Sequence, residues 1–224
     1  MYLQVMVNYL KNLFIELFIN LDKIISFDIK LFLKINGYNN PNLDIFMYLV
    51  SNPYIWIFLY LLFLVGIIMK EKKFFWLPIL ILIIGIGITD FTSVHLFKET
   101  IRRLRPCHNP QLIDLVHTVG KHCGGKYGFI STHAANAFMI ITFLSYFFRN
   151  KIITISLIFW GLLISYSRIY LGVHYPLDVL SGAIWGIIIG ALSILIYKYL
   201  YNYMQKAYYF KKKRRIQWWD KYFF

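Results

Sequence analysis

Long apolar runs constrain what this chain can fold into more than any other feature. A helix needs roughly 20 apolar residues to cross a bilayer. Segments of about that length occur at 53–69, 74–95, 129–148, 152–170 and 177–200. Only 15% of the 224 residues are charged, whereas soluble domains carry about 25%. We therefore predict an all-α integral membrane helical bundle with five transmembrane helices.

The first 50 residues are less uniformly apolar. They place charges such as Lys11 and Glu16 among apolar residues at near-helical spacing. This pattern is typical of amphipathic helices that lie at the membrane interface. A sixth span near the N-terminus is the alternative, at the cost of burying those charges. We accordingly divide the chain into an interfacial segment 1–50, a membrane core 51–200 and a basic-aromatic cytoplasmic tail 201–224.

The basic residues between the apolar runs predict an orientation. The short basic segments 70–73, 149–151 and 211–215 fall on one side of the membrane if all five runs cross it. Lysine and arginine mark cytoplasmic loops, so the 96–128 and 170–176 loops should face the other side. We expect a multi-pass protein of the bacterial inner membrane. The net charge of +14 then reflects membrane topology and anion binding, and we expect no nucleic-acid partner.

The loop after the second run carries a basic motif. Lys98, Arg102 and Arg105 follow one another at i, i+4 and i+7, which predicts a single stripe on a helix that ends at Pro106. Like charges along one face destabilise a bare helix, so an anion between them is one interpretation. Contact with lipid headgroups is the other. Arg102 and Arg103 are candidate contacts for a second phosphate or a headgroup, and the helical face favours Arg102.

A second polar motif, Ser131-Thr132-His133, begins the third apolar run. Serine is a good helix N-cap, and the free backbone N–H groups of a helix start bind phosphate oxygens. His133 would lie in the first turn and face the same anion. An ordinary helix cap with a histidine at the membrane interface is the alternative for this segment alone.

The third motif follows the fourth apolar run. Arg168 lies at the end of that run, where an unpaired cation is costly. His174 precedes Pro176, which suits the first turn of the last helix, and Asp178 follows four residues later. A carboxylate beside one ring nitrogen fixes the tautomer and leaves the other nitrogen free to attack. A purely structural His–Asp pair is the alternative.

Together the motifs meet the needs of phosphoryl transfer, which depends on positioning and on neutralising the phosphate oxygens. The expected phosphate-binding residues are Lys98, Arg105, Ser131, Thr132 and Arg168. His174 would attack phosphorus while Asp178 orients its ring. His133 would protonate the leaving oxygen and then activate water. The sequence has no carboxylate cluster that would hold a metal ion, so we expect no metal and no cofactor.

In order and spacing these motifs resemble the type 2 phosphatidic acid phosphatase superfamily, which includes bacterial lipid phosphatases and vanadium haloperoxidases. The matching elements run from Lys98 to Pro106, from Ser131 to His133 and from Ser167 to Asp178. The family usually has Pro-Ser-Gly-His in the second element, where this chain has Ile130-Ser131-Thr132-His133. The resemblance covers roughly residues 53–200. It implies a helical bundle, a phospho-histidine intermediate, no metal requirement and inhibition by vanadate.

The implied partner is a lipid phosphate or diphosphate in the bilayer, with no obligate protein partner. Recycling of undecaprenyl diphosphate is a common bacterial need, so our first expectation is an undecaprenyl diphosphate phosphatase. A lipid A phosphatase and a phosphatidylglycerophosphate phosphatase are the alternatives. A non-catalytic transporter or binder of anionic lipids would not need a nucleophile, an orienting carboxylate and a second histidine. A haloperoxidase would be soluble, which the apolar runs oppose.

Cys107 and Cys123 lie in the same predicted extracytoplasmic loop, where disulfides persist. We hypothesise that they are bridged. His108, His117 and His122 lie nearby, so a zinc site is the alternative. Zinc ligands normally show short paired spacings, and these residues do not, which favours ordinary loop histidines.

Overall fold

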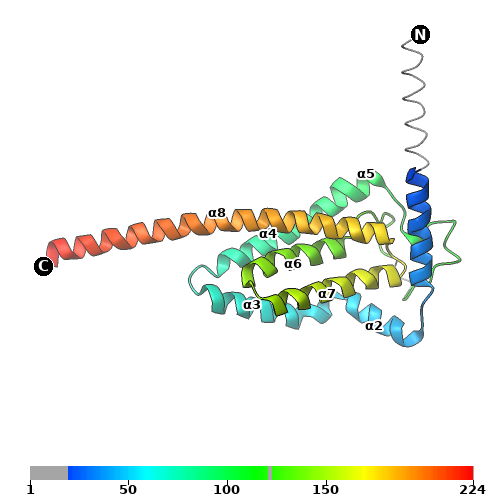
Figure 1. The fold of residues 1–224 in the computed structure, drawn as a ribbon, viewed down its shortest axis with the longest axis horizontal. Helices are drawn as coiled ribbons and strands as arrows, with labels where there is room; N and C mark the ends of the chain where they lie inside the picture. The colour runs from blue at the N-terminus through cyan, green and yellow to red at the C-terminus, as the bar shows by residue number, and fades with distance from the viewer. Residues whose placement is uncertain (1–19, 121–122, 224) are drawn as a thin grey trace, which may run out of the picture.

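The protein is a bundle of apolar helices, described by a computed structural model for residues 20–120 and 123–223 (Figure 1). Four helical stretches are long and apolar enough to cross a membrane, namely Pro53–Glu71, Trp76–Ile101, Lys151–Tyr170 and Pro176–Lys212. The remaining predicted run forms a shorter apolar helix, Thr132–Phe148. Within the described residues the only bridge between extended segments joins Leu104 to Tyr127. The predicted all-helical membrane bundle is therefore confirmed.

The helices cover the predicted apolar runs, but their first and last residues differ from the predicted bounds. The membrane core contains η1 (Pro53–Trp56), α3 (Ile57–Glu71), α4 (Trp76–Thr92), η2 (Ser93–Lys98), α5 (Glu99–Ile101), η3 (Pro106–His108), α6 (Thr132–Phe148), α7 (Lys151–Tyr170) and α8 (Pro176–Phe223). A helix over residues 20–36 and α2 (Pro41–Ser51) precede the core. The last helix continues well past the bundle, so the described part of the 201–224 tail is helical.

Helix α6 lies in the centre, packed between α4, α7 and α8. Its contact with α8 is close because α8 presents glycines to it. A Cβ atom at Gly182 would overlap the backbone of Ser131, and one at Gly186 would overlap the backbone of Ala135. Small residues of this kind allow membrane helices to approach closely. The approach brings the start of α6 against the start of α8, where the second and third motifs lie.

The helix over residues 20–36 lies crosswise at the end of the bundle that carries these motifs (Figure 1). Asn36, which is 1% exposed, fixes its end. Its Nδ2 donates to the carbonyls of His117 and Tyr170 over 2.8 and 2.7 Å, and its Oδ1 accepts from the His117 N–H over 2.8 Å. The predicted sixth span involves residues 1–19, which lie outside the described residues.

The basic turns gather at the opposite end of the bundle. Lys70 Nζ donates hydrogen bonds to the carbonyls of Phe147 and Phe148, which end α6, over 2.5 and 3.0 Å. These bonds satisfy carbonyls that a helix end leaves without partners. The turns 70–73 and 149–151 therefore lie side by side, and the site motifs lie at the other end of the same helices.

Candidate phosphate-binding active site

The first motif does not form the predicted helical stripe. The second membrane helix passes through the π-helical turn η2 and ends at Ile101, well before Pro106. Arg102 then adopts a left-handed conformation with φ of 54°, and its exposed side chain donates to the carbonyl of Glu99 over 2.9 Å. Arg105 is in extended backbone, with its N–H bonded to the carbonyl of Lys126. A π turn and a left-handed residue redirect the side chains, so regular helical spacing fails here.

Despite that correction, Lys98 and Arg105 reach the same cavity. It has a volume of about 790 Å³, and six of the predicted site residues line it, namely Lys98, Arg105, Thr132, His133, Arg168 and His174. Arg102 does not line it, so its expected contact with a second phosphate has no support from this geometry. The cavity therefore brings together the cations and both histidines expected from the sequence.

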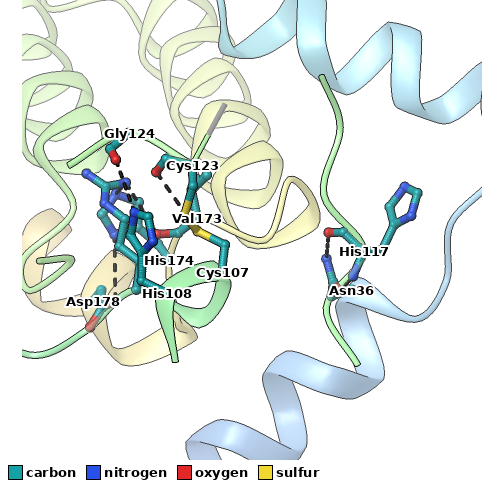
Figure 2. Close-up of a disulfide and its surroundings, with 10 residues drawn as sticks. Asn36, Cys107, His108, His117, Cys123, Gly124, Val173, His174 and Asp178 are labelled. Carbon is teal, nitrogen blue, oxygen red and sulfur yellow. Dashed lines mark hydrogen bonds and ion pairs between the residues drawn. A yellow bond between two sulfur atoms is a disulfide. The ribbon is translucent and has the colours of Figure 1, made fainter. Parts of the chain in front are cut away.

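His174 lies at the cavity wall with 1% of its surface exposed. Its Nδ1 is 3.6 Å from Asp178 Oδ2, and its Nε2 is 3.3 Å from Arg105 Nη1 (Figure 2). Because a guanidinium only donates, Nε2 accepts, so the ring proton is on Nδ1 and faces Asp178. Burial and the nearby charges of Arg105, Arg168 and Lys98 lower the pKa of His174 well below its ordinary value. The imidazole is therefore neutral, as a nucleophile requires.

Asp178 is fully buried behind His174 and is held by groups from other elements. Its Oδ2 accepts from the Tyr175 N–H over 3.0 Å, and its Oδ1 accepts from Arg103 Nη1 over 2.7 Å. Arg103 also donates from Nη2 to Asp28. Sequence reasoning preferred Arg102 to Arg103 as an anion contact, because an unbroken helix places Arg103 off the stripe, and it did not predict that Arg103 pairs with Asp178 and Asp28. No local pattern marks Asp28.

The second motif is positioned as predicted but bonded differently. Ser131 occupies the N-cap of α6, yet its side chain makes no capping hydrogen bond, which corrects our expectation. Its N–H instead donates to the backbone carbonyl of Asp178 over 2.9 Å. The Thr132 hydroxyl accepts from Lys98 Nζ over 2.6 Å. The start of α6 is therefore hydrogen-bonded to the backbone of Asp178, and its Thr132 side chain holds Lys98 in place.

Several buried polar atoms around this site have no hydrogen-bond partner. Among the described residues they include Arg105 Nε, Ser131 Oγ and Arg168 Nε. Arg168 does donate from Nη1 to the Ser51 hydroxyl. A buried donor without a partner costs roughly 1–3 kcal/mol, so such donors indicate a ligand with acceptor oxygens. A phosphate group, with its negative charge and accepting oxygens, suits them.

The cavity continues from this polar end into the membrane region between α3, α4, α6 and α7. That part is lined by apolar and aromatic side chains, among them Trp56, Phe63, Leu82, Ile140 and Trp160. A second cavity of about 370 Å³ shares Arg105, His133 and Arg168 with the first and is bordered by Val119, Cys123 and Gly124 of the long loop. The cationic site therefore lies where an apolar cavity meets a more polar one.

The long loop that borders the second cavity is closed by a disulfide between Cys107 and Cys123, whose Cα atoms are 6.1 Å apart (Figure 2). His108 Nε2 lies 3.2 Å from the carbonyl of Gly124, and His117 is 2.8 Å from Asp44. No group of three or more His, Cys, Asp or Glu side chains suitable for a metal occurs in the described ranges. His122, the third histidine of the zinc alternative, lies outside them.

Fold and site together define a multi-pass membrane protein with a phosphate-binding active site. The model of the PAP2 superfamily matches residues 54–202, and the chain belongs to that superfamily, as the motifs predicted. Its membership of that superfamily, together with its similarity to the lipid phosphatases described below, shows that this chain is a phosphatase.

Three curated relatives extend over most of the chain. A lipid A 4'-phosphatase from Porphyromonas gingivalis is 37% identical over 80% of this chain and 76% of its own length. A lipid A 4'-phosphatase from Bacteroides thetaiotaomicron is 36% identical over 71% and 72%. An undecaprenyl-diphosphatase from Sulfolobus acidocaldarius is 30% identical over 77% and 79%.

Among solved structures, LpxE from Aquifex aeolicus superposes with a TM-score of 0.56 at 29% identity, covering 74% of this chain and 93% of its own. A transmembrane PAP2-type phosphatidylglycerolphosphate phosphatase from Bacillus subtilis has the same fold, with a TM-score of 0.62 at 24% identity, covering 78% of this chain and 86% of its own. The helical membrane architecture is thus shared with solved members of the superfamily.

Proposed function

We propose that this chain is a lipid A phosphatase that removes the 4'-phosphate. Two relatives that match most of the chain at 37% and 36% identity carry that activity in their names, which favours our alternative over undecaprenyl diphosphate. The observation that carries the proposal is the larger cavity, which has a polar and an apolar end. The cations and both histidines line its polar end, and its apolar end extends between the membrane helices. An amphiphile with a phosphate at its polar end fits both parts.

The first chemical step would use His174 as the nucleophile. Its Nε2, which lies beside Arg105 at the cavity wall, carries the lone pair, while Asp178 supports the charge that the ring gains. Nε2 forms a bond to phosphorus as the bond from phosphorus to the sugar oxygen breaks. The other cavity histidine, His133, gives its proton to that leaving oxygen. Lys98, Arg105 and Arg168 compensate the charge on the remaining phosphate oxygens.

The second step would release phosphate. A water molecule attacks phosphorus, His133 takes the proton from it, and the bond between phosphorus and Nε2 breaks. The products are inorganic phosphate and the original neutral His174. The second cavity, which shares Ser51 and Pro53 with the first, also reaches His133 and is bordered by the long loop, so it would offer water a route to the site.

The orientation belongs to the same proposal. We infer that the basic turns 70–73 and 149–151 and the tail face the cytoplasm. The active site at the other end of the bundle would then face the extracytoplasmic side of the inner membrane. The crosswise helix over residues 20–36 would lie along that interface, in keeping with the interfacial segment expected from the sequence.

A phosphate-release panel tests the substrate. Purified protein in detergent is offered lipid A, undecaprenyl diphosphate, phosphatidic acid and phosphatidylglycerophosphate in parallel. We expect lipid A to give the highest kcat/KM, with mass spectrometry locating the loss at the 4' position. Faster hydrolysis of undecaprenyl diphosphate would favour the second candidate, which the more distant archaeal relative supports.

The matched variant is His174→Ala, which should accumulate in the membrane and release no phosphate from any lipid of the panel. A full rate in that variant would rule out the histidine mechanism whichever lipid is preferred.

A further inference from the structure

Arg103 joins two buried carboxylates that lie far apart in the sequence. Its Nη1 donates to Asp178 Oδ1 over 2.7 Å, and its Nη2 donates to Asp28 Oδ2 over 2.5 Å. Asp28 is 1% exposed and Asp178 is fully buried. The two buried carboxylates and the partly exposed guanidinium form a triad with a net charge of −1.

The triad is held rigidly. The Arg103 guanidinium lies 4.0 Å from the centre of the Tyr175 ring. Asp28 Oδ1 accepts from the Leu177 N–H over 2.9 Å, and Asp178 Oδ2 accepts from the Tyr175 N–H over 3.0 Å. Asp28 therefore contacts both Arg103 and the residue directly before Asp178. It belongs to the helix over residues 20–36, which precedes the segment matched by the family model.

The charge balance at His174 depends on this arrangement. The cations Arg105, Arg168 and Lys98 surround His174, and Asp178 is the carboxylate beside its ring. If Arg103 paired with Asp178 alone, the guanidinium would cancel the charge of that carboxylate. Because Asp28 shares Arg103, one net negative charge remains. A developing positive charge on His174 needs that charge, since opposite charges attract strongly where water is excluded.

We propose that Asp28 is a positioning residue of the active site. By pairing with Arg103, it keeps the negative charge of Asp178 available to His174 during attack on phosphorus. The N-terminal segment then completes the catalytic charge balance in addition to packing against the bundle. The inference rests on the proposed nucleophilic role of His174.

The first test replaces Asp28 with asparagine, which keeps the shape and an acceptor oxygen for Leu177 but removes the charge. Kinetics are measured on the panel lipid that the wild type hydrolyses fastest. We expect kcat to fall by about tenfold or more with KM changed by less than about threefold, since the charge acts in the transition state. Asp22→Asn is the matched control, because Asp22 lies on the same helix with an exposed side chain. It should retain the wild-type rate.

The second test is charge compensation. Asp28→Asn combined with Arg103→Gln restores a net charge of −1 on Asp178, although it removes more contacts than the single change. We expect the double variant to be about threefold or more faster than Asp28→Asn alone. A residue that acted only by packing would give the opposite result, with the double variant slower than either single variant. That result would overturn the proposal.

Asp28→Glu keeps the negative charge but lengthens the side chain. This variant should therefore keep most of the wild-type kcat. Equal losses in the glutamate and asparagine variants, or an unchanged kcat in a folded Asp28→Asn protein, would also reject the proposal. Failure of the underlying mechanism is distinguishable, because it would show as an active His174→Ala protein. If Asp28→Asn does not accumulate in the membrane, the kcat of Asp28→Glu relative to the wild type gives the test, and a loss of about tenfold or more in folded Asp28→Glu protein would overturn the proposal.

Discussion

Lys98 Nζ donates a hydrogen bond to the hydroxyl of Thr132 over 2.6 Å. Thr132 occupies the position where the family pattern usually has glycine. A lysine side chain has several rotatable bonds, and ordering it costs up to about 2 kcal/mol of conformational entropy. The threonine therefore orders the Lys98 side chain, which a glycine at that position would not do, and we expect this order to favour phosphate binding.

The contribution of this contact is measured by Thr132→Val, which preserves the shape and removes the acceptor. We expect KM to rise by about threefold to tenfold, because a hydrogen bond to a charged group contributes roughly 1.5–3 kcal/mol and the freed lysine keeps part of its effect. Thr132→Ser retains the hydroxyl and serves as the control with near wild-type KM. Equal KM values in the valine and serine variants would show that the hydroxyl does not position Lys98.

The stability of the protein should fall in acid because of His174. Burial and neighbouring cations lower the pKa of His174 well below 6.5 in the folded protein. As the pH falls below 6.5 the unfolded chain takes up a proton that the folded chain does not. The free energy of unfolding then decreases by up to about 1.4 kcal/mol for each pH unit.

Thermal unfolding in detergent at pH 7.5 and 5.5 measures this effect. His174→Gln, which cannot take up the proton, should lose less Tm between the two pH values than the wild type. If the variant lost as much Tm as the wild type, protonation of His174 would not be a cause of acid destabilisation.

Gly128 lies against the His174–Asp178 pair. A Cβ atom there would be 3.1 Å from Asp178 Oδ2 and 3.2 Å from Arg105 Cγ. Both contacts are tighter than a Cβ atom normally makes, so Gly128→Ala should shift Asp178 or Arg105 slightly and lower kcat by about tenfold, since small misplacements near reacting groups are costly. A Cβ at Gly125 meets nothing within 4 Å, so Gly125→Ala is the control. Similar rates for both variants would contradict the tight fit.

The disulfide should stabilise the long loop. Cys107 and Cys123 are separated by 16 positions, and closing a loop of that size contributes about 3 kcal/mol in the chain-entropy model. Non-reduced protein should contain no free thiol, and Cys107→Ser with Cys123→Ser should lower Tm by several degrees. Two titratable thiols in non-reduced wild-type protein would show that the bond does not form.

Chelation of metals should leave the enzyme active. Lys98, Arg105 and Arg168 line the phosphate cavity and supply the positive charge that a metal ion provides in other phosphatases. We expect the phosphate-release rate in excess EDTA to match the untreated rate. A metal-dependent phosphatase assayed in the same buffer is the control. A loss that added divalent cations reverse would require a different mechanism.

The sequence alone determined which parts of the chain form membrane helices, because each span requires a long apolar run. It also identified the cations and both histidines that line the cavity, since they belong to motifs with fixed spacing. The assumption of regular helical spacing gave a wrong prediction for the first motif. The helical stripe that grouped Arg102 with Lys98 assumed an unbroken α-helix, and the π turn before residue 99 and the left-handed Arg102 changed the directions of the side chains.

Only the tertiary structure decided which groups hold Asp178 in place. Arg103 and Asp28 are 75 positions apart, and no local periodicity relates them. They meet because the helix over residues 20–36 crosses the end of the bundle. At that end the glycines of α8 allow the start of α8 to pack against the start of α6. Local sequence encodes helix formation and burial of single faces, whereas a buried ion pair depends on the packing of elements that are distant in the chain.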